Sequence, residues 1–133
     1  MYKVIKKMEF CYGHRLMDHG GPCKHLHGHN ARVELELAAE NLNSKGMVRD
    51  FLEIKQVIKA WVDQSFDHRL LLQEGDPLIS VLKKADEPIV TVAYPPTAEN
   101  LAREIFFYAK KSGFPVRQVR IWETESSMAS FGE

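Results

Sequence analysis

The sequence has few cysteines, no net charge and no long apolar run. Its two cysteines, Cys11 and Cys23, are too few for a disulfide framework and are expected as free thiols in a reducing compartment. Lys plus Arg and Asp plus Glu each number 18, so we expect no basic surface for nucleic acid or anionic lipid. No apolar stretch approaches the roughly 20 residues of a membrane span, and the first residues lack the apolar run of a secretion signal. These absences predict a cytoplasmic protein without nucleic-acid or membrane partners.

The histidines are the one unevenly distributed residue type. The chain has 133 residues, 44% of them hydrophobic, which predicts a single domain over residues 1–133 with a well-filled core. Of its six histidines, five fall between residues 14 and 29, at positions His14, His19, His25, His27 and His29. This crowding needs a structural or chemical reason.

Apolar periodicity indicates an α+β arrangement with a mostly antiparallel sheet and helices packed on it. Asp50 with Glu53 has the spacing of a capping box before one helix, and Thr97 has the position of a cap for another, with Gly113 just past its end. Residues 65–72 are expected to form a junction, and residues 75–82 a short helix or turn. Strands are expected at residues 2–14, 27–37, 89–94 and 116–124, and the two long helices at residues 51–62 and 98–112.

Position on a predicted strand or in the loop between strands separates the crowded histidines into two groups. His27 and His29 are two residues apart on a strand and project to one side of the sheet. If the first two predicted strands form a hairpin, His14 at the end of one strand faces them. Three histidines with an open position are typical of a catalytic zinc site. The alternative is a polar sheet end whose histidines bond to backbone groups. The other two, His19 and His25, fall in the loop between the two predicted strands and are expected to be solvated.

Two further residues have chemistry that the pattern leaves open. Cys23 lies four residues before His27, so it is either a fourth zinc ligand that closes a structural site or a free thiolate beside the metal. Glu123 occupies the buried parity of the last predicted strand. It is either a ligand-binding carboxylate or half of an ion pair with Arg117 or Arg120.

Several sequence blocks resemble the 6-pyruvoyltetrahydropterin synthase family. The most specific is Cys-x-x-x-His-Gly-His from Cys23 to His29, and its three-residue spacer is similar to the bacterial 6-carboxytetrahydropterin synthase branch of the queuosine pathway. The resemblance extends over nearly the whole chain. The blocks that carry it are residues 10–16, 23–30, 46–51, 66–70, 96–101 and 122–124.

The resemblance implies a fold, an assembly and roles for individual residues. The implied fold is the tunnelling fold, a four-stranded antiparallel sheet with two helices on one face. Such chains assemble into a trimeric barrel and usually a hexamer, with active sites between subunits. The implied roles are zinc binding by His14, His27 and His29, a catalytic base at Cys23, a partner dyad of Asp67 and His68, a pterin anchor at Glu123, and pocket lining by Thr97 and Glu99.

The implied activity is that of a zinc-dependent carbon-carbon lyase. Its substrate is 7,8-dihydroneopterin triphosphate, and its products are 6-carboxytetrahydropterin, acetaldehyde and triphosphate. A 6-pyruvoyltetrahydropterin synthase, a carbon-oxygen triphosphate lyase, or a paralogue with altered pterin specificity is an alternative. A zinc-stabilised binding module closed by Cys23 is another.

The sequence departs from the family pattern two residues before His14. Relatives often have a small residue at this position, whereas this chain has Tyr12. The larger side chain is expected to narrow the pocket or to change the preferred substrate side chain. The triphosphate contacts are unassigned, with Arg15, Lys24 and Lys55 as candidates.

Overall fold

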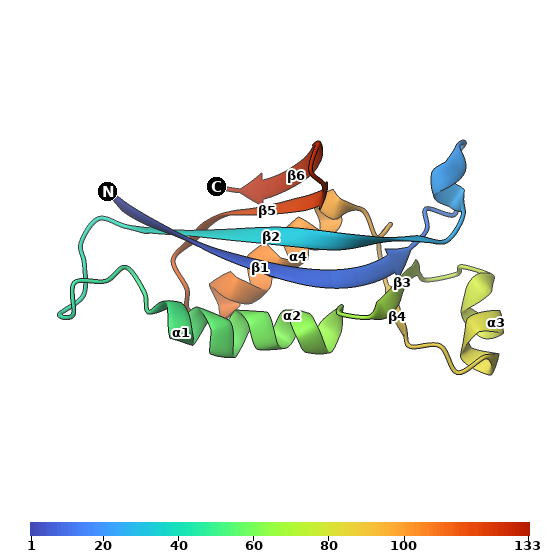
Figure 1. Ribbon diagram of the computed structural model, residues 1–133, viewed down its shortest axis with the longest axis horizontal. Helices are drawn as coiled ribbons and strands as arrows, with labels where there is room; N and C mark the ends of the chain where they lie inside the picture. The colour runs from blue at the N-terminus through green and yellow to red at the C-terminus, as the bar shows by residue number, and fades with distance from the viewer.

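The computed structural model describes residues 1–133 and contains one curved sheet with helices packed on it (Figure 1). The sheet has six strands in the order β4-β3-β1-β2-β5-β6 and mixes parallel with antiparallel pairs. Strand bounds are β1 (Tyr2–His14), β2 (His27–Ala39), β3 (Arg69–Gln73), β4 (Ile89–Val92), β5 (Val116–Thr124) and β6 (Ser127–Gly132).

A long antiparallel hairpin of β1 and β2 forms the centre of the sheet. It pairs Tyr2 with Ala39 at one end and His14 with His27 at the other. Alternate residues of the two strands face the core, where Phe10 and Val33 are buried. The period-2 pattern predicts this hairpin because a one-residue slip would turn its apolar side chains to solvent.

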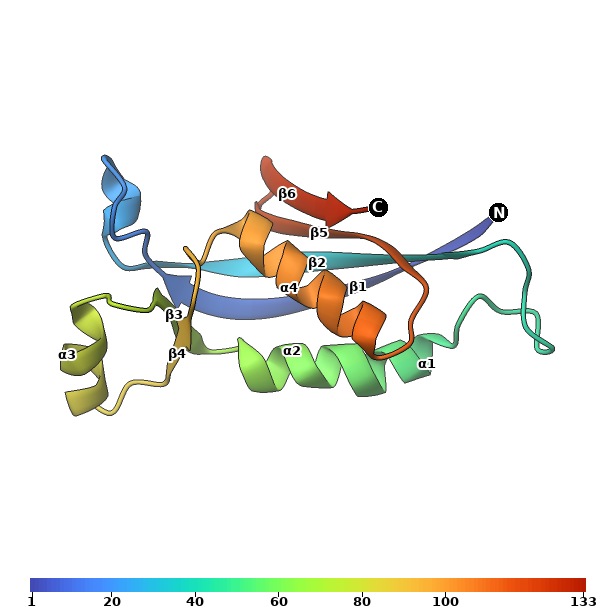
Figure 2. The same ribbon diagram turned by 180° about the vertical axis from the view of Figure 1, so that it is seen from behind.

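Two helical segments cover one face of the sheet (Figure 2). The first begins at Asp50, whose side chain accepts a hydrogen bond from the Leu52 amide, and runs through α1 (Phe51–Ile54), a π-helical stretch (Lys55–Lys59) and α2 (Ala60–Ser65). The second, α4 (Ala98–Lys111), is capped by the Thr97 hydroxyl, and Gly113 follows it with φ 86°. The predicted caps of both helices are therefore confirmed, whereas the π-helical stretch was not predicted.

The expected four-stranded antiparallel sheet is wrong in strand number and in strand direction. The end of the expected junction forms β3 (Arg69–Gln73), which pairs in parallel with β1 and β4. Residues 127–132 form β6, antiparallel to β5. Both strands escape the sequence pattern, because β3 is a short continuous apolar run and β6 consists mainly of small residues. The predicted strand at 89–94 is present as β4, and the short helix at 75–82 as α3 (Leu78–Lys84).

No helix of the structure combines the length and the apolar character needed to cross a membrane.

Candidate functional site

Three histidines converge where β1 ends and β2 begins. His14 and His27 are directly paired across the hairpin, and His29 lies two residues further along β2 on the same face. One ring nitrogen from each lies within 4.8 Å of the others. His14 is 3% exposed, and the ring centres of His14 and His27 are 4.5 Å apart. Strand parity therefore predicts this cluster correctly.

Backbone carbonyls fix the orientation of two of these rings. The Nδ1 of His14 donates to the Pro96 carbonyl at 2.7 Å, and the Nδ1 of His27 donates to the carbonyl of His25 at 2.8 Å. A ring that donates from Nδ1 has its lone pair on Nε2. The Nε2 atoms of His14 and His29 are buried without a hydrogen-bond partner in the protein. Burial also lowers the pKa of His14 and favours the neutral ring that a metal needs.

This donor set fits a metal ion. Buried nitrogens without partners are costly unless a ligand satisfies them, and imidazole is a preferred ligand of divalent transition metals. Cys23 is not part of the cluster of converging ligand atoms. His19 and His25 also lie outside it, as expected, and both are exposed.

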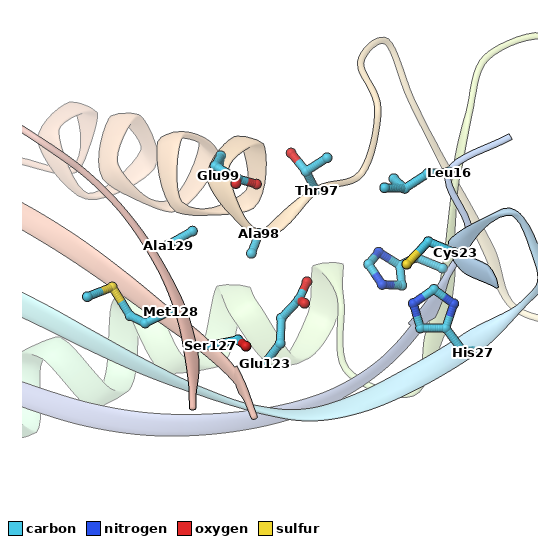
Figure 3. Close-up of a pocket in the computed structure, with 11 residues that line it drawn as sticks. Leu16, Cys23, His27, Thr97, Ala98, Glu99, Glu123, Ser127, Met128 and Ala129 are labelled. Carbon is cyan, nitrogen blue, oxygen red and sulfur yellow. The ribbon is translucent and has the colours of Figure 1, made fainter. Parts of the chain in front are cut away.

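A pocket of about 270 Å³ opens beside the histidines (Figure 3). Cys23 and His27 lie together at one end of the pocket, and the Glu123 side chain extends from β5 toward its centre. Thr97 and Glu99, at the start of α4, line another side. The remaining lining residues are His14, Leu16, Ala98, Ser127, Met128 and Ala129. The pocket therefore combines two histidines of the converging group, a thiol and carboxylates within one concavity.

Glu123 is held by Tyr12 rather than by an arginine. The Tyr12 hydroxyl donates to Oε1 of Glu123 at 3.2 Å, while Oε2 lies 3.7 Å from Nε2 of His29. Arg120 is instead paired with Glu36 at 2.7 Å and with Glu34 at 3.8 Å, and neither Arg120 nor Arg117 forms an ion pair with Glu123. Burial, reinforced by the Glu123 charge, raises the pKa of Tyr12 and keeps its hydroxyl protonated.

Tyr12 does not narrow the pocket, contrary to the expectation from its size. Its side chain is 1% exposed and is absent from the pocket lining. The ring packs against Phe10 and the histidines, so its bulk is absorbed by the core. Only its hydroxyl acts on the pocket, through Glu123.

The loop that carries Cys23 is tied to the rest of the fold by a buried ion pair. Arg15 donates from Nε to Oδ2 of Asp76 at 2.8 Å and from Nη2 to Oδ1, and its Nη1 reaches the Lys24 carbonyl at 3.4 Å. The adjacent Leu16 amide donates to the Cys23 carbonyl at 2.9 Å. Hydrogen bonds from Arg15 hold the pKa of Asp76 below its usual value. Sequence reasoning missed Asp76 altogether because no local pattern links it to residue 15.

Asp67 and His68 lie outside the pocket that contains Cys23. Asp67 accepts hydrogen bonds from the Cys11 amide at 2.8 Å and from Nδ1 of His68 at 2.9 Å. The hydrogen bond from the Cys11 backbone amide is the main reason that the pKa of Asp67 is lowered. His68 has a positive φ of 57°, and its side chain is 79% exposed. It borders a separate pocket of about 400 Å³, which also contacts His27.

The comparisons with known proteins agree on one family. The family model described as 6-pyruvoyl tetrahydropterin synthase matches residues 3–133. A Rickettsia bellii protein named 6-carboxy-5,6,7,8-tetrahydropterin synthase is 38% identical, with 93% of this chain and 95% of the relative aligned. A Haemophilus influenzae protein of the same name is 29% identical over both full lengths.

Solved structures show the same fold. The crystal structure of an uncharacterized Wolinella succinogenes protein superposes with a TM-score of 0.81 at 24% identity and covers 99% of this chain and 98% of its own. Caenorhabditis elegans 6-pyruvoyl tetrahydropterin synthase superposes with a TM-score of 0.73 at 23% identity, covering 99% and 95%. These two likenesses establish the architecture.

Proposed function

Because the chain belongs to the 6-pyruvoyl tetrahydropterin synthase family, we propose that it is a zinc-dependent 6-carboxytetrahydropterin synthase. It would convert 7,8-dihydroneopterin triphosphate to 6-carboxytetrahydropterin with release of acetaldehyde and triphosphate. The names of the curated relatives support this product. The observation that carries the proposal is the convergence of three histidine nitrogens beside a pocket lined by Cys23 and Glu123.

The metal site would be formed by His14, His27 and His29. Three imidazoles with an open position are the donor set of catalytic zinc. A zinc ion bound there supplies Lewis-acid polarisation of substrate oxygen, so that a nearby carbon-bound proton becomes easier to remove. The backbone bonds to Nδ1 of His14 and His27 would hold the two rings in the required orientation.

Cys23 would act as the base that removes this proton. Its side chain lines the same pocket as His14 and His27 but is outside the converging ligand group. A nearby cation favours the thiolate form of a cysteine. In this proposal, therefore, Cys23 is a catalytic residue and not a fourth metal ligand.

Glu123 would anchor the pterin. A carboxylate accepts two parallel hydrogen bonds from the 2-amino group and the adjacent ring N–H of a pterin, which fixes the orientation of the ring. Thr97 and Glu99 line the opposite wall of the pocket. The Thr97 hydroxyl already accepts a hydrogen bond from the Asn100 amide at 3.2 Å, so its first role is to cap α4.

Asp67 and His68 would serve the pocket of a neighbouring subunit. In one chain His68 and Cys23 line different pockets, and Asp67 lines neither. The hydrogen bonds of Asp67 hold His68 at the surface, where it can relay protons to a site across an interface. We therefore include in the proposal a homo-oligomer, a trimeric barrel or a hexamer, with active sites between subunits and a role in cytoplasmic queuosine biosynthesis.

Product identification tests the proposal. The zinc-loaded protein is incubated with 7,8-dihydroneopterin triphosphate, and the pterin product is identified by mass. 6-Carboxytetrahydropterin with acetaldehyde is expected. A 6-pyruvoyl product would assign the chain to the other activity of the family, and no turnover would contradict both.

The Cys23→Ala variant separates an enzyme from a zinc-stabilised binding module. The proposal expects this variant to retain about one zinc per chain and its thermal stability while losing turnover. Loss of zinc together with stability would instead identify Cys23 as a fourth ligand of a structural site. Metal content by atomic emission and unfolding by circular dichroism provide the two readouts.

A further inference from the structure

Tyr12 completes a square of side chains whose other corners are the three clustered histidines. The β1–β2 register pairs His14 with His27 and Tyr12 with His29, and the Gly13–Gly28 pair lies between them, so the four side chains project from the same face. The Tyr12 ring lies 4.9 Å from that of His14 and 5.6 Å from that of His29. It therefore lies beneath the site, in the core.

The hydroxyl of Tyr12 is directed toward the pocket carboxylate, Glu123. It donates to Oε1 of Glu123 at 3.2 Å, across 111 residues of sequence. Oε2 accepts no hydrogen bond and is close to His29. Glu123 lines the pocket, whereas Tyr12 does not. The bond thus connects a fixed core ring to a half-buried carboxylate that a ligand can reach.

We propose that Tyr12 is a positioning residue that orients the Glu123 carboxylate for a heterocycle carrying adjacent amino and ring N–H groups. This inference rests on the proposed function, in which Glu123 anchors a pterin. A glutamate side chain has several rotamers, and two-point recognition needs the plane of its carboxylate held in one of them. The hydrogen bond to Oε1 provides this restraint and leaves Oε2 and the second lone pair of Oε1 for the ligand.

Tyr12→Phe removes the hydroxyl and keeps the ring that packs in the core. We expect the variant to bind 7,8-dihydroneopterin about tenfold more weakly. This factor corresponds to the low end of the range measured when a hydrogen bond to a charged group is removed. The KM for the triphosphate substrate should rise by a similar factor, with kcat within about twofold and zinc content unchanged. Binding is measured by calorimetry on the zinc-loaded protein.

Tyr108→Phe is the matched control, because Tyr108 stacks on Trp61 at 3.9 Å and is absent from the pocket lining. It should bind the pterin as the wild type does. A double-mutant cycle with Glu123→Gln then tests the route of the effect. If Tyr12 acts through Glu123, adding Tyr12→Phe to Glu123→Gln should weaken binding much less than it weakens the wild type.

Four results would overturn the inference. Equal pterin affinity of Tyr12→Phe and of a wild type that binds pterin would show that the hydroxyl does not position Glu123. Independent, additive effects in the cycle, or zinc loss in Tyr12→Phe, would place its action elsewhere. Failure of the wild type itself to bind 7,8-dihydroneopterin would contradict the proposed function, and this inference with it.

Discussion

The ion pair between Arg15 and Asp76 provides the most direct test of how the site is held together. Asp76→Asn removes the charge and keeps the shape of the side chain. The carboxylate accepts two hydrogen bonds from Arg15 and one from the Leu78 amide at 2.8 Å. An asparagine offers one acceptor oxygen and turns an NH₂ group toward donors, so the guanidinium loses its counter-charge.

The size of the effect follows from the burial of the two partners. The Asp76 side chain is 1% exposed and that of Arg15 is 18% exposed. Breaking a buried pair costs roughly 3–5 kcal/mol, and the partial access of Arg15 to water places this pair near the lower limit, at about 3 kcal/mol. For a chain of this length, that corresponds to a decrease in Tm of about 12 °C. Turnover should fall as well, because Arg15 and Leu16 hold the loop of Cys23.

Thermal unfolding followed by circular dichroism, at one protein concentration and one zinc concentration, measures the difference. Asp63→Asn is the matched control. Asp63 pairs with Lys59 on an exposed helix face and is 44% exposed, so its loss should cost less than about 1 kcal/mol. Equal destabilisation by the two substitutions would refute the argument from burial.

The pH dependence of the Tm difference between wild type and Asp76→Asn gives an independent check. Arg15 lowers the pKa of folded Asp76 below the unfolded value of about 3.9. A group with a depressed folded pKa stabilises the protein fully above its unfolded pKa and loses this contribution as pH falls through the folded pKa. The Tm gap between wild type and Asp76→Asn should therefore be constant from about pH 8 to 5 and shrink below about pH 4. A gap that shrinks near neutral pH would point to another group.

Three further predictions concern the metal site and the start of α4. His14→Ala should lower zinc content well below one per chain, whereas His25→Ala should not, because residue 25 contributes only its carbonyl to the site. Gly28→Ala should weaken zinc binding, since the added Cβ would lie 2.9 Å from a backbone oxygen of the facing strand, while Gly20→Ala meets nothing within 4 Å. Thr97→Ala should destabilise the protein by about 1 kcal/mol in urea unfolding, and Thr97→Ser by much less, because serine retains the capping oxygen.

Each of these predictions has an outcome that contradicts it. Full zinc content in His14→Ala, measured by atomic emission, would remove that residue from the metal site. Equal zinc affinities for the two alanine-for-glycine variants, measured by competition with a chelator, would show that the hairpin absorbs the added methyl group. Equal urea midpoints for the two Thr97 variants would mean that the cap does not limit stability.

The histidine cluster and the helix starts could be predicted from the sequence because short-range geometry specifies them. On a strand, residues two apart share a face, so parity places His27 and His29 together, whereas His25 lies in the loop before β2 begins. Capping is equally local. The Asp50 side chain accepts a hydrogen bond from the backbone amide two residues ahead, and the Thr97 side chain accepts one from the amide three residues ahead. These features depend on backbone periodicity, which a sequence displays directly.

Only the tertiary structure decided how distant segments complete the site. The bond between Tyr12 and Glu123 spans 111 residues and that between Arg15 and Asp76 spans 61, and no periodicity relates these positions. The mixed six-stranded sheet was missed for the same reason, because the parallel pairing of β3 with β1 brings together segments with no local signal. The separation of Asp67 and His68 from the Cys23 pocket likewise follows from the folded chain. The sequence by itself thus determined which nitrogens meet and marked Glu123 and Cys23 as candidates, whereas packing determined that Tyr12 holds Glu123 and that Asp76 holds the loop of Cys23.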